Sequence, residues 1–132
     1  MMQKNKVVHE YLGCQFKEQR SIKAVQEIID RAYSDQMSKQ EEDVFRVAFV
    51  VFVVSTLLSP SAKHDYASVD YWNELEDPSS ISKYDWSEFV MTRLLDAVTK
   101  LKQDVSSSIK FPIITGCSLF LQVFPFYFYH FL

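Results

Sequence analysis

Apolar residues dominate one stretch of the chain, 44–58, in which 47–54 is an unbroken run of eight. Periodicity alone does not separate a buried helix from a buried strand here, and the valine and phenylalanine content favours a strand. The boundaries favour a helix, because Ser38 and Glu41 have capping-box spacing and Pro60 supplies a stop. We therefore predict a central helix, covered by other helices on most of its sides.

Helical periodicity recurs on both sides of this stretch. The first segment, 21–33, has Ser21 as its N-cap, and its apolar face consists of Ile22, Val25, Ile28, Ile29, Ala32 and Tyr33. The second, 86–103, has Asp85 as its cap and Glu88 at the third helical position. Its apolar stripe consists of Trp86, Phe89, Val90, Leu94, Ala97, Val98 and Leu101. We expect Phe89, Leu94 and Val98 to pack on the central helix.

Shorter elements complete the pattern. Val69, Trp72 and Leu75 recur every three residues before Asp77-Pro78 ends their element. A last helix is predicted to begin at Phe111-Pro112, where proline suits a first turn, and to be interrupted at Pro125. Its apolar positions are Ile113, Ile114, Cys117, Phe120, Leu121 and Phe124.

Together these patterns predict an all-α fold, a single domain of about five helices around the central hydrophobic helix 44–58. The whole run 47–54, Phe49 included, is expected in the core. The predicted parts are a partly ordered N-terminal arm (1–20), a helical domain (21–124) and an aromatic C-terminal tail (125–132). A length of 132 residues with 48% hydrophobic content suits one domain, and the presence of only two glycines argues against an all-β sandwich.

Charge and the N-terminal sequence bear on partners and location. A net charge of -3 leaves no basic footprint for phosphates, which disfavours a nucleic-acid partner. The chain starts with polar residues, without the apolar segment of a secretory signal. We expect an intracellular protein, in the nucleus or cytoplasm, that is not secreted.

The two cysteines, Cys14 and Cys117, allow one disulfide in principle, but a reducing compartment predicts free, buried thiols. The pairs His9 with Cys14, and Cys117 with His130, offer too few ligands at no known spacing for a metal. No metal, cofactor or small-molecule ligand is therefore assigned.

Residues suited to catalysis are few. His64 and Asp65 could act as a base and its orienting acid, but adjacent residues on a polar loop are read as ordinary surface groups. A thiol hydrolase would use Cys117 with His130 or His64, yet Cys117 lies on a hydrophobic face without the positive surroundings that activate a thiol. We predict no catalytic residue and no enzyme. Likewise, Tyr84, Trp86 and Phe89 could stack on a ligand, but their helical spacing favours core packing.

A membrane-associated alternative depends on 111–132, since Arg46 leaves only the twelve residues 47–58 in the central stretch, against roughly 20 needed for a span. The segment 111–132 is long enough, but Pro112 and Pro125 weaken it and no Lys or Arg anchors its far end. Membrane insertion is disfavoured.

Several motifs, taken in order, resemble a known group of proteins. They are Leu12-Gly13, Val44-Phe45-Arg46-Val47-Ala48-Phe49-Val50-Val51-Phe52 running to Leu57-Leu58-Ser59-Pro60, Ile81 with Tyr84-Asp85-Trp86, and Gly116-Cys117-Ser118-Leu119-Phe120-Leu121-Gln122. Over residues 7–124 the chain resembles uncharacterised plant proteins of mobile-element (transposon) origin. In that group such a helical region often precedes a ubiquitin-like-protein (SUMO) protease domain of the cysteine type.

The chain departs from that group at several positions. The group tends to have Gly near Ser55, Cys at Ser59, and Gly-Gly-Cys where this chain has Thr115-Gly116-Cys117. Its members usually continue into more polar sequence, so the aromatic ending is expected of a truncated product. No protease residue carries over, because the resemblance places the catalytic His, Asp and Cys in a downstream domain.

The resulting functional prediction is a non-catalytic helical accessory or interaction module of a transposon-related plant protein, with an unidentified protein partner. The alternatives are a remnant of a ubiquitin-like-protein cysteine protease polypeptide that lacks its catalytic domain, or a membrane-associated protein using 111–132.

Overall fold

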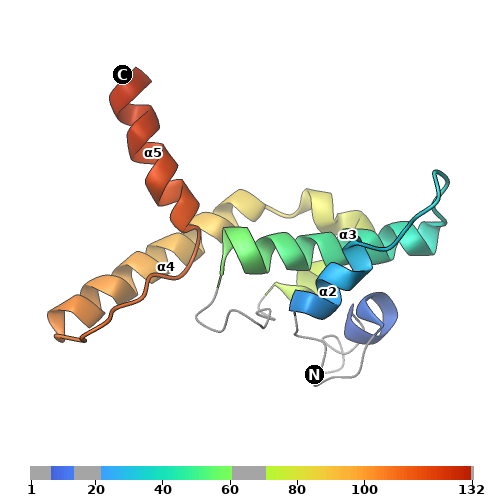
Figure 1. The fold of residues 1–132 in the computed structure, drawn as a ribbon, viewed down its shortest axis with the longest axis horizontal. Coiled ribbons are helices and arrows are strands. Elements are labelled where there is room, and N and C mark those ends of the chain that lie inside the picture. The colour runs from blue at the N-terminus through green and yellow to red at the C-terminus, as the bar shows by residue number, and fades with distance from the viewer. Residues whose placement is uncertain (1–6, 14–21, 61–70, 132) are drawn as a thin grey trace.

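The computed structural model describes residues 7–13, 22–60 and 71–131, and every regular element in these residues is helical (Figure 1). In chain order the elements are the π-helix η1 (Val7–Leu12), α2 (Ile22–Ile29), α3 (Lys39–Val53), the π-helix η2 (Val54–Leu58), the 3₁₀-helices η3 (Trp72–Leu75) and η4 (Pro78–Lys83), α4 (Trp86–Ser106) and α5 (Ser118–Phe131). The predicted all-α fold around a central hydrophobic helix, formed here by α3 and η2, is confirmed.

The starts of the two longest helices are set by local hydrogen bonds that the sequence predicts. Ser38 Oγ accepts from the backbone N–H of Glu41 at 3.2 Å, and Glu41 Oε2 accepts from the backbone N–H of Ser38 at 2.8 Å. The bond from the Ser38 backbone is the main reason why the pKa of Glu41 lies below its usual value. At α4, Asp85 Oδ1 accepts from the backbone N–H of Glu88 at 2.9 Å. Both predicted caps are confirmed.

One hydrophobic core joins the N-terminal elements to the central helix. Its buried members are Val7, Tyr11, Leu12, Val25, Ile28, Val47, Ala48, Val51, Val54, Tyr71, Trp72 and Leu75. Since η1 lies inside the predicted N-terminal arm, that part of the arm belongs to the core. The hydroxyl of Tyr71 lies 3.2 Å from Ser55 Oγ, so these two buried polar groups satisfy each other.

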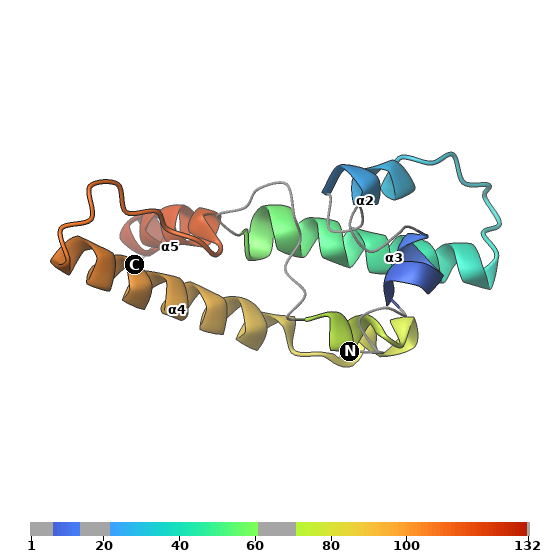
Figure 2. The same ribbon diagram turned by 90° about the horizontal axis from the view of Figure 1, so that it is seen from below.

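The described residues cover only part of the circumference of the central helix, with α2 and η1 on one side and the segment from Tyr71 to η4 on another (Figure 2). Val47, Ala48 and Val51 are fully buried beneath α2 and η1, whereas Phe49 is 50% exposed. The prediction that the whole run 47–54 lies in the core is therefore wrong for Phe49. The physical reason is that successive residues turn by about 100° around a helix, so an apolar run of eight points in every direction and the neighbouring elements leave the face of Phe49 open.

The α4 helix continues past the C-terminal end of η2, as both views show (Figures 1 and 2). Phe89, near its start, packs against the core as predicted. Leu94 is buried outside that core, in contact with the segment at Gly116, and the half-buried Val98 also lies outside it. The prediction that Leu94 and Val98 pack on the central helix is wrong, because the chain that follows α4 runs back along α4 and covers this face.

The last helix begins later and continues further than predicted. Residues 111–117 are not helical, because Gly116 turns the chain with a φ of +80° and its N–H donates to the carbonyl oxygen of Pro60 at 3.2 Å. From Ser118, α5 continues through Pro125, so the predicted interruption is also wrong. A proline removes a single N–H donor, and the surrounding turns carry the helix past it. The helix points away from the rest of the molecule (Figure 1).

Candidate interaction surface

The one described thiol is a buried side chain and is not paired with a histidine. Cys117 is free and 6% exposed, immediately before α5. His130 lies twelve residues beyond Ser118 on the same helix, which corresponds to about 18 Å of helix rise, and its Nδ1 is 3.0 Å from the carbonyl oxygen of Phe126. The described part of the chain therefore does not pair Cys117 with His130, one of the two histidines considered for a thiol hydrolase.

Cys117 should consequently react slowly with a maleimide in the folded chain. In a Cys14→Ser background it is the only thiol, and we expect its alkylation to be at least about tenfold slower than in urea, because burial limits the access of the reagent. Fast alkylation of the folded chain, with an apparent pKa well below that of a free thiol, would contradict this expectation and revive the thiol-hydrolase alternative.

The other residues considered for chemistry are not assembled into a site by the described structure. His64, Asp65, Cys14 and the side chain of His9 lie outside the described residues. Within 7–13, 22–60 and 71–131, no group of three or more His, Cys, Asp or Glu side chains is arranged to hold a metal ion.

The aromatic stripe at the start of α4 serves core packing, as its spacing predicts. Trp86 and Phe89 pack edge-on against Tyr71, with ring centroids 6.2 and 5.7 Å from it. Trp86 Nε1 donates to the carbonyl oxygen of Ile81 at 2.8 Å, which fixes the indole ring. The ring of Tyr84 packs edge-on against that of Trp86, with their centroids 4.8 Å apart. These rings join η4 and α4 to the core.

A shallow hollow of about 380 Å³ lies on the outer side of this stripe. Within it, the guanidinium of Arg93 lies 5.3 Å from the centroid of the Phe89 ring. The acidic residues that line the hollow are Asp85, Glu88 and Asp96. Asp85 already caps α4, and hydrogen bonds from Ser87 and from the Glu88 backbone hold its pKa low. The hollow lacks a nucleophile beside a base, so its described side chains assemble no catalytic pair.

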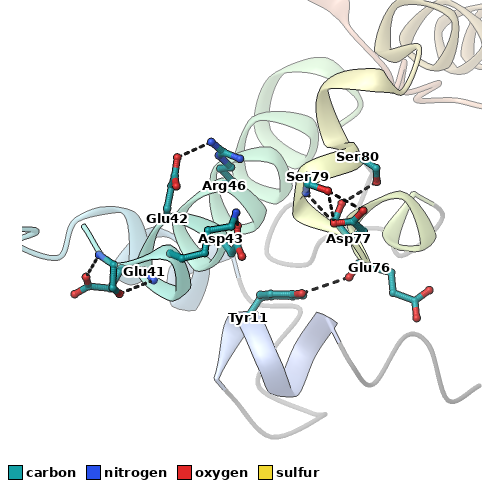
Figure 3. A network of polar contacts seen from close by, with 11 residues as sticks. Tyr11, Glu41, Glu42, Asp43, Arg46, Glu76, Asp77, Ser79 and Ser80 are labelled. Atoms are coloured by element: carbon teal, nitrogen blue, oxygen red, sulfur yellow. Dashed lines mark hydrogen bonds and ion pairs between the residues drawn. The ribbon is translucent and has the colours of Figure 1, made fainter. Parts of the chain in front are cut away.

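A second group of polar residues lies where η1 meets the turn between η3 and η4 (Figure 3). The hydroxyl of Tyr11 donates to the carbonyl oxygen of Glu76 at 3.3 Å, and the pKa of Tyr11 is raised, first by burial and then by Glu10. Asp77 caps η4 by accepting from the backbone N–H and the hydroxyl of Ser79, which lowers the pKa of Asp77. These contacts are structural: Asp77 is the N-cap of η4, whereas η3 ends before it, at Leu75.

Exposed apolar side chains gather most densely on α5. Seven of them are between 37% and 84% exposed: Leu119, Phe120, Leu121, Val123, Phe124, Phe126 and Tyr129. Residues 111–132 contain no Asp, Glu, Lys or Arg. This helix thus presents a largely aromatic surface, and none of its described side chains is buried.

A second uncharged strip runs along the central helix, where the sequence pattern had predicted only core residues. We call Phe45, Phe49, Val53 and Leu57 the outer ridge; Phe49 and Leu57 are exposed and the other two are half-buried. Their spacing of four residues was the available signal, because it separates them from Val47, Val51 and Val54 on the core side. Phe45 and Phe49 stack with centroids 6.2 Å apart.

No helix among the described residues combines the length and the apolar content needed to cross a membrane. The fourteen residues of α5 amount to about 21 Å, shorter than the roughly 30 Å hydrocarbon core of a bilayer.

Fold and surface together define an all-α domain whose described polar groups include caps, ion pairs and local hydrogen bonds, and which exposes large apolar side chains on α5 and on the central helix. The chain belongs to the family described as Domain of unknown function (DUF8566), which matches residues 2–122. That match covers the core elements, α4 and the first turn of α5. The search of curated proteins found no match, and the search of solved structures found none either.

Proposed function

We propose that this domain is a non-catalytic helical module that binds another polypeptide through the uncharged surface of α5. The observation that carries the proposal is the exposure of seven large apolar side chains on one helix. With about 200 Å² for each fully exposed side chain of this size, they present about 700 Å² to solvent. Folded monomers seldom expose an apolar patch above a few hundred Å².

The stability of α5 supports the same proposal. A helix of fourteen residues is marginal in water on its own, and an interior proline such as Pro125 costs about 3 kcal/mol. Aromatic residues add little helix propensity. A helix of this composition therefore needs a covering surface, and a bound polypeptide supplies one.

The wider role we propose is an accessory region in a plant protein of mobile-element origin, ahead of a ubiquitin-like-protein protease domain and acting inside the cell. The support for this is the resemblance carried by the motifs at 44–60 and 116–122. The genomic sequence downstream of the codon for Leu132 provides the test. An open reading frame that continues into a His/Asp/Cys protease domain is expected, and a downstream sequence without one would remove the support for this role.

The binding role is tested by photo-crosslinking in cells. Benzoylphenylalanine replaces Phe124 on α5, which is 52% exposed, and in a matched control it replaces Val105 near the end of α4, which is 59% exposed. We expect discrete crosslinked polypeptides from position 124 that are lost when Val123→Lys is added, and none from position 105. Equal labelling from both positions, or no polypeptide adduct from position 124, would contradict the proposal.

A further inference from the structure

We propose that the polypeptide bound by α5 is a second copy of this chain, and that each copy lays its α5 along the outer ridge of the other. The inference rests on the proposed function, because it names the partner of the same surface. Four features of the described residues carry it: the position, length, chemistry and area of the two surfaces.

Position comes first, since α5 and the outer ridge meet at one corner of the molecule. The hydrogen bond from Gly116 N–H to the carbonyl oxygen of Pro60 holds the base of α5 beside the end of η2. Leu57, the last residue of the outer ridge, lies three residues before Pro60. Figure 1 shows α5 leaving this corner and pointing away from its own central helix. If a two-fold axis passed through this corner, the first turn of each α5 would lie next to the outer ridge of the other copy.

Length agrees with this arrangement. The outer ridge from Phe45 to Leu57 spans twelve residue steps, or about 18 Å of helix. The fourteen residues of α5 span about 21 Å. One α5 can therefore follow the entire ridge of its partner.

The chemistry of the two surfaces also matches. The outer ridge carries only apolar side chains, and α5 has no Asp, Glu, Lys or Arg. The nearest charged neighbour on the helix, Arg46, is already bonded to Glu42 at 2.5 Å. A partner with a charged contact face would lose the hydration of those charges without finding a counter-charge, so an apolar partner is favoured.

Area distinguishes this pairing from simpler ones. Two α5 helices packed on each other would cover about half of each, or about 350 Å² per copy, well below the roughly 800 Å² of a standard interface. The reciprocal arrangement buries one face of α5, about 350 Å², and one outer ridge, about 250 Å², on every copy, or about 600 Å² per copy. Because each copy gives a helix and receives one, the contact is isologous and closes at a dimer.

The first experiment measures the dissociation constant of the proposed dimer, formed by the full chain, by analytical ultracentrifugation. The wild-type chain is expected to run at twice the 15.5 kDa of a single copy. Phe49→Lys on the ridge and Phe124→Lys on α5 should each weaken the dimer at least about a hundredfold, because each would bury a charge in an apolar contact. The matched control Val105→Lys, equally exposed but remote from the contact, should leave it unchanged. Circular dichroism confirms that each variant is folded.

The second experiment identifies the contact. Isotopically light and heavy chains, each with benzoylphenylalanine at position 124, are mixed, crosslinked and analysed by mass spectrometry. Mixed-isotope crosslinks from position 124 to residues 45–57 are expected. Crosslinks confined to one isotope would show α5 folded back on its own ridge, and links between two copies of position 124 would show α5 paired with α5; either result overturns the proposal.

Failure of the dimer and failure of the proposed function give different results. A monomeric chain that still crosslinks to a different protein in cells overturns the second-copy proposal and leaves the binding function intact. A monomeric chain without any polypeptide adduct, or one that sediments with phosphatidylcholine vesicles instead, overturns both.

Discussion

Replacing Trp72 with alanine is expected to lower the free energy of unfolding by about 3 to 5 kcal/mol, the largest effect of any single change considered for this protein. Trp72 is 2% exposed and packs in the core with Leu75 and the central helix. Removing the indole leaves a cavity that the surrounding helices fill only in part. Urea unfolding followed by circular dichroism, at a concentration low enough to keep the chain monomeric, measures the loss.

Two companion variants make the expectation specific. Phe49→Ala removes an aromatic ring that is half exposed, so it should cost less than about 1.5 kcal/mol in the monomer. Trp72→Phe keeps most of the buried ring and removes an indole N–H that has no hydrogen-bond partner among the described residues, so its cost should also be small. If Phe49→Ala were as damaging as Trp72→Ala, the face of the central helix that carries Phe49 would have to be covered as well.

Replacing Gly116 with valine is expected to cost about 2 to 5 kcal/mol, from two causes that add. A side chain at a φ of +80° costs about 1 to 2 kcal/mol. In addition, a Cβ would lie 3.4 Å from the Leu94 Cα and 3.6 Å from the Ala97 Cβ, so the valine methyl groups would have to displace α4, at about 1 to 3 kcal/mol.

Gly13→Val is the matched control for this change. Gly13 also has a positive φ, +64°, but no described atom lies within 4 Å of the position of its Cβ. It should therefore lose only the backbone contribution, and the gap between the two variants, about 1 to 3 kcal/mol, measures the contact of Gly116 with α4. Equal losses in the two variants would mean that the turn at Gly116 does not press against α4.

For the candidate surface, sequence reasoning succeeded with the aromatic stripe and failed with the ridge. The helical spacing of Trp86 and Phe89 indicated core packing because both residues fall on the stripe that α4 turns inward. The exposure of Phe49 escaped notice because an unbroken apolar run has no polar residue to mark its outer face. The projection of α5 from the domain was not predicted, because Pro125 was expected to end the helix.

The sequence by itself determined the helical class of the fold and the starts of its two longest helices. The Ser38 and Asp85 caps involve hydrogen bonds between residues three apart, so the residues that form them are already neighbours in the chain. Only the tertiary structure decided that Phe49 faces outward, that Leu94 is buried against Gly116, and that α5 projects from the domain. Each of these depends on which distant segment lies alongside, and local periodicity carries no record of that segment's position.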